Sequence, residues 1–64
     1  MHERSTLTAR EHEILTWLSR GKTNPEIAAI LWISPGTVRK HLENIYPKLE
    51  VTTRAGAVGR FLSD

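Results

Sequence analysis

The sequence contains no cysteine, which excludes both a disulfide framework and a cysteine-based zinc site. It has no apolar run of membrane-spanning length, and residues 1–6 lack the apolar core of a signal peptide. Charge of one sign is also scarce, because nine lysines and arginines against seven acidic residues leave a net charge of +2. So small an excess does not by itself identify a nucleic-acid partner. We expect a cytoplasmic protein with no membrane partner.

Nothing in the sequence is typical of a metal site or a catalytic centre. The histidines His2, His12 and His41 are scattered, and no carboxylates surround them at ligand spacing. His41 lies near Thr37 and Glu43, but an exposed helix lacks the water-excluding cleft that acid–base catalysis needs. We therefore expect no metal, no cofactor and no enzymatic activity.

The sequence does contain residues that typically start and end helices. The chain of 64 residues allows one small domain, and its segments between threonine, serine, glycine and proline have a helical period, with no alternating run long enough for a strand. Thr8 and Glu11 are spaced for a capping box at the start of a first helix. Gly21 supplies its left-handed stop. The apolar face of this helix is Ile14, Leu15, Trp17 and Leu18.

A short second helix and a longer third one follow. Thr23 or Asn24 caps the second, with Pro25 in its first turn. Ser34 and Pro35 start the third helix so soon after the second that the chain must turn sharply, as in a helix-turn-helix. The third helix has a buried stripe of Val38, Leu42, Ile45 and Leu49, an opposite arc of Gly36, Arg39, Lys40 and Glu43, and a flank of Thr37, His41, Asn44 and Lys48.

A fourth helix is predicted to start near Thr52 or Thr53. Its apolar arc, which is wider than one core contact requires, comprises Ala55, Ala57, Val58, Phe61 and Leu62. The pattern indicates a terminal helix with a second partner, although core packing explains much of it. The prediction is an all-α, four-helix bundle-like helix-turn-helix domain over residues 7–64, with residues 1–6 as an N-terminal arm or linker stub.

The outward arc of the third helix has two interpretations. Arg39 and Lys40 suit guanine acceptors, and Glu43 can accept from the cytosine amino group, so a helix lying in the major groove could read bases with them. The alternative is an ordinary solvated face, on which Arg39 and Glu43 form a weak ion pair within the helix. The sharp turn before this helix favours DNA binding.

The chain strongly resembles the LuxR/GerE-type helix-turn-helix domain of bacterial regulators, in order and without a gap over nearly its whole length. The matching residues are Leu7-Thr8, Arg10-Glu11 and Glu13-Ile14-Leu15 in the opening segment; Gly21, Thr23-Asn24 and Glu26-Ile27-Ala28 at the second helix; Leu31, Ile33-Ser34, Thr37-Val38 and Lys40-His41-Leu42 at the turn and third helix; and Asn44-Ile45, Lys48-Leu49, Val51 and Arg54 beyond it.

This resemblance implies sequence-specific binding of double-stranded DNA by the effector domain of a transcription regulator, with the third helix as the recognition helix. It implies Arg39, Lys40 and Glu43 as base-reading residues, and Thr23, Asn24, Thr37, His41, Asn44, Lys48 and Arg54 as contacts to the DNA backbone. It also implies a homodimer on DNA through Ala55, Val58, Gly59 and Leu62, and it allows RNA polymerase as a protein partner. The alternative function is a domain of this fold that contacts proteins and has lost its operator.

Three residues depart from the family pattern. Trp32 and Glu50 stand where the family favours glycine, after the second and third helices. A left-handed backbone is unfavourable for a bulky residue, so we expect a distorted turn at Trp32 or an indole packed over the edge of the core. Pro47 removes an amide donor inside the third helix. We therefore expect that helix to end or kink near Tyr46.

Overall fold

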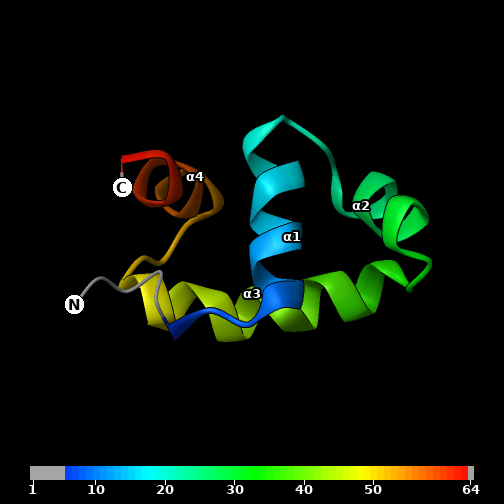
Figure 1. Cartoon of the computed structure of the whole chain (residues 1–64), viewed down its shortest axis with the longest axis horizontal. Helices are drawn as coiled ribbons and strands as arrows, with labels where there is room; N and C mark the ends of the chain where they lie inside the picture. The colour runs from blue at the N-terminus through cyan, green and yellow to red at the C-terminus, as the bar shows by residue number, and fades with distance from the viewer. Residues whose placement is uncertain (1–5, 64) are drawn as a thin grey trace.

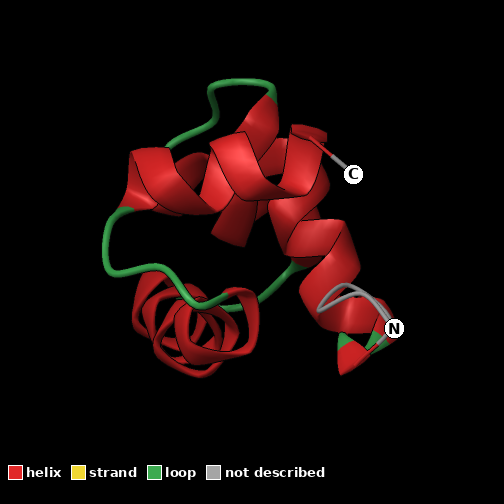
Figure 2. Ribbon diagram, turned by 90° about the vertical axis from the view of Figure 1, so that its left-hand side faces the viewer, coloured by secondary structure: helices red, strands yellow, loops and turns green. Residues whose placement is uncertain are grey.

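The computed structural model describes residues 6–63, and these form four helices joined by short loops (Figure 1; Figure 2). The helices are α1 (Ala9–Ser19), α2 (Asn24–Leu31), α3 (Pro35–Leu49) and α4 (Arg54–Ser63). No strand occurs among the described residues. The all-α prediction is therefore confirmed. Of the predicted N-terminal arm, residues 1–5, which include His2, lie outside the described part of the chain.

A hydroxyl side chain caps the start of every helix. The four capping residues are Thr8, Thr23, Ser34 and Thr53, and each accepts a hydrogen bond from the amide three residues later at 2.9–3.3 Å. At α1 and α2 the bond is reciprocated, because the carboxylates of Glu11 and Glu26 accept from the amides of Thr8 and Thr23. These two capping boxes satisfy first-turn donors that a helix cannot pair internally. They confirm the predicted capping box of the first helix and identify Thr23, rather than Asn24, as the cap of the second.

The first three helices end in the same left-handed turn, although only one of them ends in glycine. Gly21, Trp32 and Glu50 have φ angles of 84°, 62° and 58°. In each case the amide of the next residue reaches back to a carbonyl five residues earlier: Lys22 to Trp17, Ile33 to Ala28 and Val51 to Tyr46. This pattern pairs carbonyls of the last helical turn that would otherwise lack partners. Carbonyl pairing therefore outweighs the side-chain preference at Trp32 and Glu50.

The expectation for Trp32 was wrong in both of its forms. The turn is regular, with Trp32 in the left-handed region at φ 62° and ψ 42°. The indole does not cover the core, since 94% of the residue is exposed to solvent. A left-handed Cβ crowds the following carbonyl whichever way the side chain points. The left-handed backbone at Trp32 is thus strained, and no burial of the side chain offsets this strain.

Replacing Trp32 with glycine is therefore expected to stabilise the protein. Relief of the left-handed conformation contributes roughly 1–2 kcal/mol, and the greater freedom of glycine in the unfolded chain offsets roughly 0.4–1 kcal/mol of it. We expect the free energy of unfolding to rise by up to about 1.6 kcal/mol in urea denaturation followed by circular dichroism. Trp32→Ala, which keeps a Cβ, is the matched control and should not produce this gain. A less stable Trp32→Gly variant would contradict the assignment of strain.

The expectation for Pro47 is corrected as well, because α3 continues through Pro47 to Leu49. Pro47 lies in the last turn, where its missing amide hydrogen removes a single helical bond. Leu49 is fully buried, and the bonds from Glu50 to Pro47 and from Val51 to Tyr46 close the end of the helix. Burial and capping on the far side of the proline thus keep the chain helical.

The core lies between α1 and the other three helices, each of which contacts α1. In Figure 1, α3 runs along one edge of the molecule, with α2 near the beginning of α3 and α4 on the other side of α1. The predicted stripe of Val38, Leu42, Ile45 and Leu49 is buried, as are Ile14, Leu15, Leu18, Ile27, Ala28, Ala57 and Phe61. Burying this face of α3 leaves its opposite face open to solvent.

Within residues 6–63, no helix is both long and apolar enough to cross a membrane.

Candidate nucleic-acid interface

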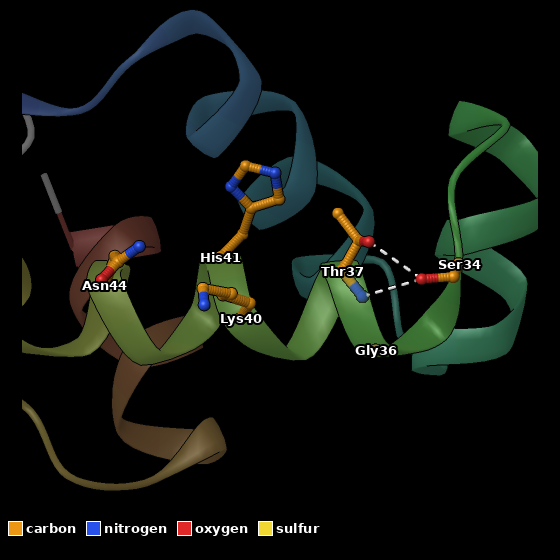
Figure 3. Close-up of a pocket in the computed structure, with 6 residues that line it drawn as sticks. All are labelled: Ser34, Gly36, Thr37, Lys40, His41 and Asn44. Carbon is orange, nitrogen blue, oxygen red and sulfur yellow. Dashed lines mark hydrogen bonds between the residues drawn. The ribbon is translucent and has the colours of Figure 1, made fainter.

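The open face of α3 carries most of the residues predicted to meet DNA. Gly36, Thr37, Arg39, Lys40, Glu43 and Asn44 are exposed, and His41 is half-buried. Figure 3 shows that Thr37, Lys40, His41 and Asn44 project from successive turns of the helix. Arg39 and Glu43 form no ion pair with each other, and neither they nor Lys40 pairs with another residue of the described chain. The two cations of this face therefore remain available to a partner.

Two depressions adjoin this face, and Gly36 lies in both. One has a volume of about 520 Å³ and is lined by Ser34, Gly36, Thr37, Lys40, His41 and Asn44. At one end of this depression the Ser34 hydroxyl accepts a hydrogen bond from the Thr37 amide and shares another with the Thr37 hydroxyl (Figure 3). The other has a volume of about 300 Å³ and is lined by Asn24, Pro35, Gly36 and Arg39. The second depression joins the first residue of α2 to the open face of α3.

Arg54 ties α4 to the same region. Its guanidinium donates to Oδ1 of Asn24 at 2.7 Å and to the carbonyl of Lys22 at 2.8 Å. The Asn24 amide nitrogen, which is not used in this contact, remains a potential donor. Residues from the beginnings of α2, α3 and α4 thus meet at one surface. The fold thus brings together three predicted DNA contacts that are far apart in the sequence: Asn24, Arg39 and Arg54.

Lys48 is placed differently from the other predicted contacts. Its ammonium lies 2.7 Å from Oε1 of Glu11 and donates to the carbonyl of Thr6 at 3.4 Å. Burial raises the pKa of Glu11, but the hydrogen bonds from Lys48 and Thr8 together lower this pKa below its ordinary value. Since only 6% of the Glu11 side chain is exposed, Lys48 neutralises a nearly buried charge.

The predicted dimer residues lie on α4 and differ in accessibility. Ala55 and Gly59 are exposed, and Leu62 is a large apolar residue that is 64% exposed. Val58 is half-buried and packs against the core. These four residues give α4 a small apolar patch in addition to the buried Ala57 and Phe61.

No cluster of three potential metal ligands occurs within the described chain. His41 lies beside an open depression on the surface of α3, and His12 contacts the Phe61 ring edge to face at a centroid distance of 5.2 Å. Neither histidine sits in an enclosed, water-excluding cleft of the kind that proton transfer to a substrate requires.

Comparison with known proteins assigns the family. The profile described as "Bacterial regulatory proteins, luxR family" matches residues 5–61, which is most of the chain. The chain belongs to this family. Within the luxR family, it is 52% identical over 52 residues to "Putative HTH-type transcriptional regulator YhjB" of Escherichia coli (strain K12), covering 81% of this chain and 26% of that protein. It is also 52% identical over 58 residues to "Probable transcriptional regulatory protein SgaR" of Hyphomicrobium methylovorum, covering 91% of this chain and 28% of that protein.

A third relative, "Transcriptional activator protein EsaR" of Pantoea stewartii subsp. stewartii, is 43% identical over 56 residues, covering 88% of this chain and 22% of that protein. The chain thus spans about a quarter of the length of these curated relatives. The resemblance inferred from the sequence is confirmed, and the chain is a helix-turn-helix domain of a family of bacterial transcription regulators.

Sequence reasoning did not single out every residue of this luxR-type surface. Ser34 was predicted only as a helix cap, yet it also lines the larger depression. Lys22 was not assigned a role, although its carbonyl holds Arg54. Gly36 was placed on the outward arc without a function. Its spacing of three and four residues before Arg39 and Lys40 was the signal that could have drawn attention to it.

Proposed function

We propose that this chain binds double-stranded DNA sequence-specifically, as the effector domain of a bacterial transcription regulator. The observation that carries the proposal is an exposed face of α3 directly after a sharp turn, with two cations, Arg39 and Lys40, that form no ion pair within residues 6–63. An α-helix with its side chains is about 10–12 Å wide, which matches a major groove about 12 Å wide. In this arrangement Arg39, Lys40 and Glu43 read base edges.

The backbone contacts that we propose surround this face. Asn24, Thr37 and Asn44 offer neutral donors, while His41 and Arg54 complete the set together with Thr23 at the start of α2. Arg54 reaches a phosphate from the beginning of α4, where it lies beside the beginning of α2 and the spare amide donor of Asn24. Lys48 differs from the rest, because its ammonium is held by Glu11. Substitution of Lys48 should therefore act first on stability and only then on DNA affinity.

The test is the affinity of the chain for a mixed-sequence DNA duplex, measured by fluorescence anisotropy at several salt concentrations. Neutralising phosphates releases counterions, so we expect affinity to fall by about a hundredfold or more between about 50 and 200 mM salt. Binding that is absent at low salt, in a chain shown to be folded by circular dichroism, would overturn the proposal. An affinity that does not change with salt would overturn it equally.

On DNA we propose a homodimer through the patch of Ala55, Val58, Gly59 and Leu62. The exposed Leu62 supports this proposal, because an apolar side chain at a contact surface is removed from water on pairing. Two copies would then occupy half-sites about one helical turn apart. Sedimentation in the presence of one-half-site and two-half-site duplexes tests the pairing, and independent occupation of the two half-sites would argue against it.

We also propose a cytoplasmic location and RNA polymerase as a partner, since a DNA-bound regulator changes transcription by acting on that enzyme. One observation favours the alternative function of protein contact without DNA. Trp32 is 94% exposed just before the proposed recognition helix, and aromatic residues are enriched at protein interfaces. The salt titration separates the two functions, because only DNA binding requires the steep dependence.

A further inference from the structure

We propose that Gly36 determines how closely this surface approaches DNA. Its missing side chain lets the first turn of α3 come into van der Waals contact with the duplex, so that Arg39 and Lys40 reach the bases. This inference rests on the proposed DNA binding, and it adds a specificity-determining residue that carries no functional group of its own.

The fold itself does not require glycine at position 36. Gly36 is not among the residues with a positive φ, and a Cβ built on it would meet only the Ser34 hydroxyl, at an ordinary contact distance of 3.8 Å. At two other positions the folded chain itself requires glycine. Gly21 has a φ of 84°, and a Cβ on Gly56 would lie 3.0 Å from Oγ1 of Thr53 and 3.3 Å from Cβ of Val51. Because glycine is also a poor helix former, the reason for Gly36 lies outside the folded chain.

The position of Gly36 indicates what that external reason is. Residues three and four apart share a helix face, so Gly36 lies one turn before Arg39 and Lys40. Helical side chains lean toward the start of the helix, and the side chains at positions 39 and 40 therefore extend over the turn that contains Gly36. Consistent with this, Gly36 lines one depression with Arg39 and the other with Lys40. A side chain at position 36 would occupy the space where both cations meet their ligand.

The test uses Gly36→Ala and Gly36→Leu with a duplex that the wild-type chain selects from a random pool. Holding α3 away from the groove should break at least one base contact, so we expect Gly36→Ala to lose about tenfold in affinity, equivalent to about 1.4 kcal/mol. Gly36→Leu should lose more. Both variants should lose less on a mixed-sequence duplex, where phosphate contacts dominate. The thermal midpoint of Gly36→Ala should be equal to that of the wild type or higher.

Ala29→Leu is the control for Gly36→Leu, since it enlarges an exposed side chain on α2 that is not among the proposed contacts. It adds comparable bulk to the surface, and on a single half-site duplex it should leave affinity unchanged. Wild-type affinity of both Gly36 variants for the selected duplex would overturn the role of Gly36 while leaving the proposed DNA binding intact. Failure of the folded wild-type chain to bind or select any duplex would instead overturn the proposed function, and this inference with it.

Discussion

Replacing Lys48 with methionine is expected to lower the free energy of unfolding by about 2–3 kcal/mol, because it leaves the nearly buried carboxylate of Glu11 without its cation. Methionine retains much of the apolar stem, so the loss reports the charge rather than a cavity. A domain of this size has a total stability of roughly 3–10 kcal/mol. Urea denaturation at neutral pH should therefore show a substantial shift of the unfolding midpoint.

The exposed pair between Arg60 and Glu50, 3.7 Å apart, provides the control. Its side chains are 41% and 67% exposed, and surface pairs contribute only about 0–1 kcal/mol. Arg60→Met should therefore change stability little. Equal effects of Lys48→Met and Arg60→Met would show that the Glu11–Lys48 pair is no more important than a surface contact.

Acid should reveal the same interaction in the wild type. The pKa of Glu11 is lowered in the folded protein, since the bonds from Lys48 and Thr8 outweigh the effect of burial. Its stabilising contribution is then complete above the unfolded-state pKa of about 4.3 and disappears as pH falls through the folded-state value. Glu26, whose pKa is lowered mainly by the Thr23 amide, adds a similar dependence in every variant. Lys48→Met should therefore lose less stability than the wild type on acidification.

Substitution of Arg39 by alanine is expected to produce the largest loss of DNA affinity among single changes on α3. Arginine can donate two hydrogen bonds to guanine, and such a contact contributes about 1–3 kcal/mol to discrimination, or roughly fivefold to 150-fold in affinity. Because Arg39 has no ion-pair partner within the described chain, its removal should leave stability nearly unchanged. The measurement is anisotropy with a wild-type-selected duplex and with versions of it that carry single base-pair changes.

Arg60→Ala removes the same formal charge from α4 and is the matched control on a single half-site duplex. We expect it to weaken binding much less and to keep the preference for every base pair. Arg39→Ala should instead lose its preference at one base pair. If both variants weaken all duplexes equally, Arg39 contributes charge without reading a base.

Much of the fold could be predicted from local chemistry. Thr8 and Glu11 specify the start of α1 through bonds that span only three residues. The spacing of Val38, Leu42, Ile45 and Leu49 likewise identifies the buried side of α3, and thereby the face that stays open. The candidate site follows from the same spacing, because a helix that buries one stripe must expose the opposite one.

Prediction failed or stopped short where contacts with other residues outweigh a residue's own preference. Pro47 opposes a helix locally, but the burial of Leu49 keeps α3 helical beyond it. Trp32 opposes a left-handed turn, but the amide of Ile33 needs that turn to reach the Ala28 carbonyl. Lys48 resembles a free surface cation until the fold brings Glu11, 37 residues earlier, to its ammonium. Neither Glu11 nor Lys48 could be identified as half of this pair from its own neighbours in the sequence.

The exposed indole at the end of α2 gives the molecule an optical property of its own. Trp17 is half-buried against the core and stacks with Arg20, whose guanidinium carbon lies 5.6 Å from the ring. Trp32 stands almost entirely in water only a few residues before α3. The two emissions should therefore respond differently to a collisional quencher such as iodide, which reaches Trp32 far more readily. The fluorescence of Trp17 reports global unfolding, and that of Trp32 reports changes at the turn while the core remains folded.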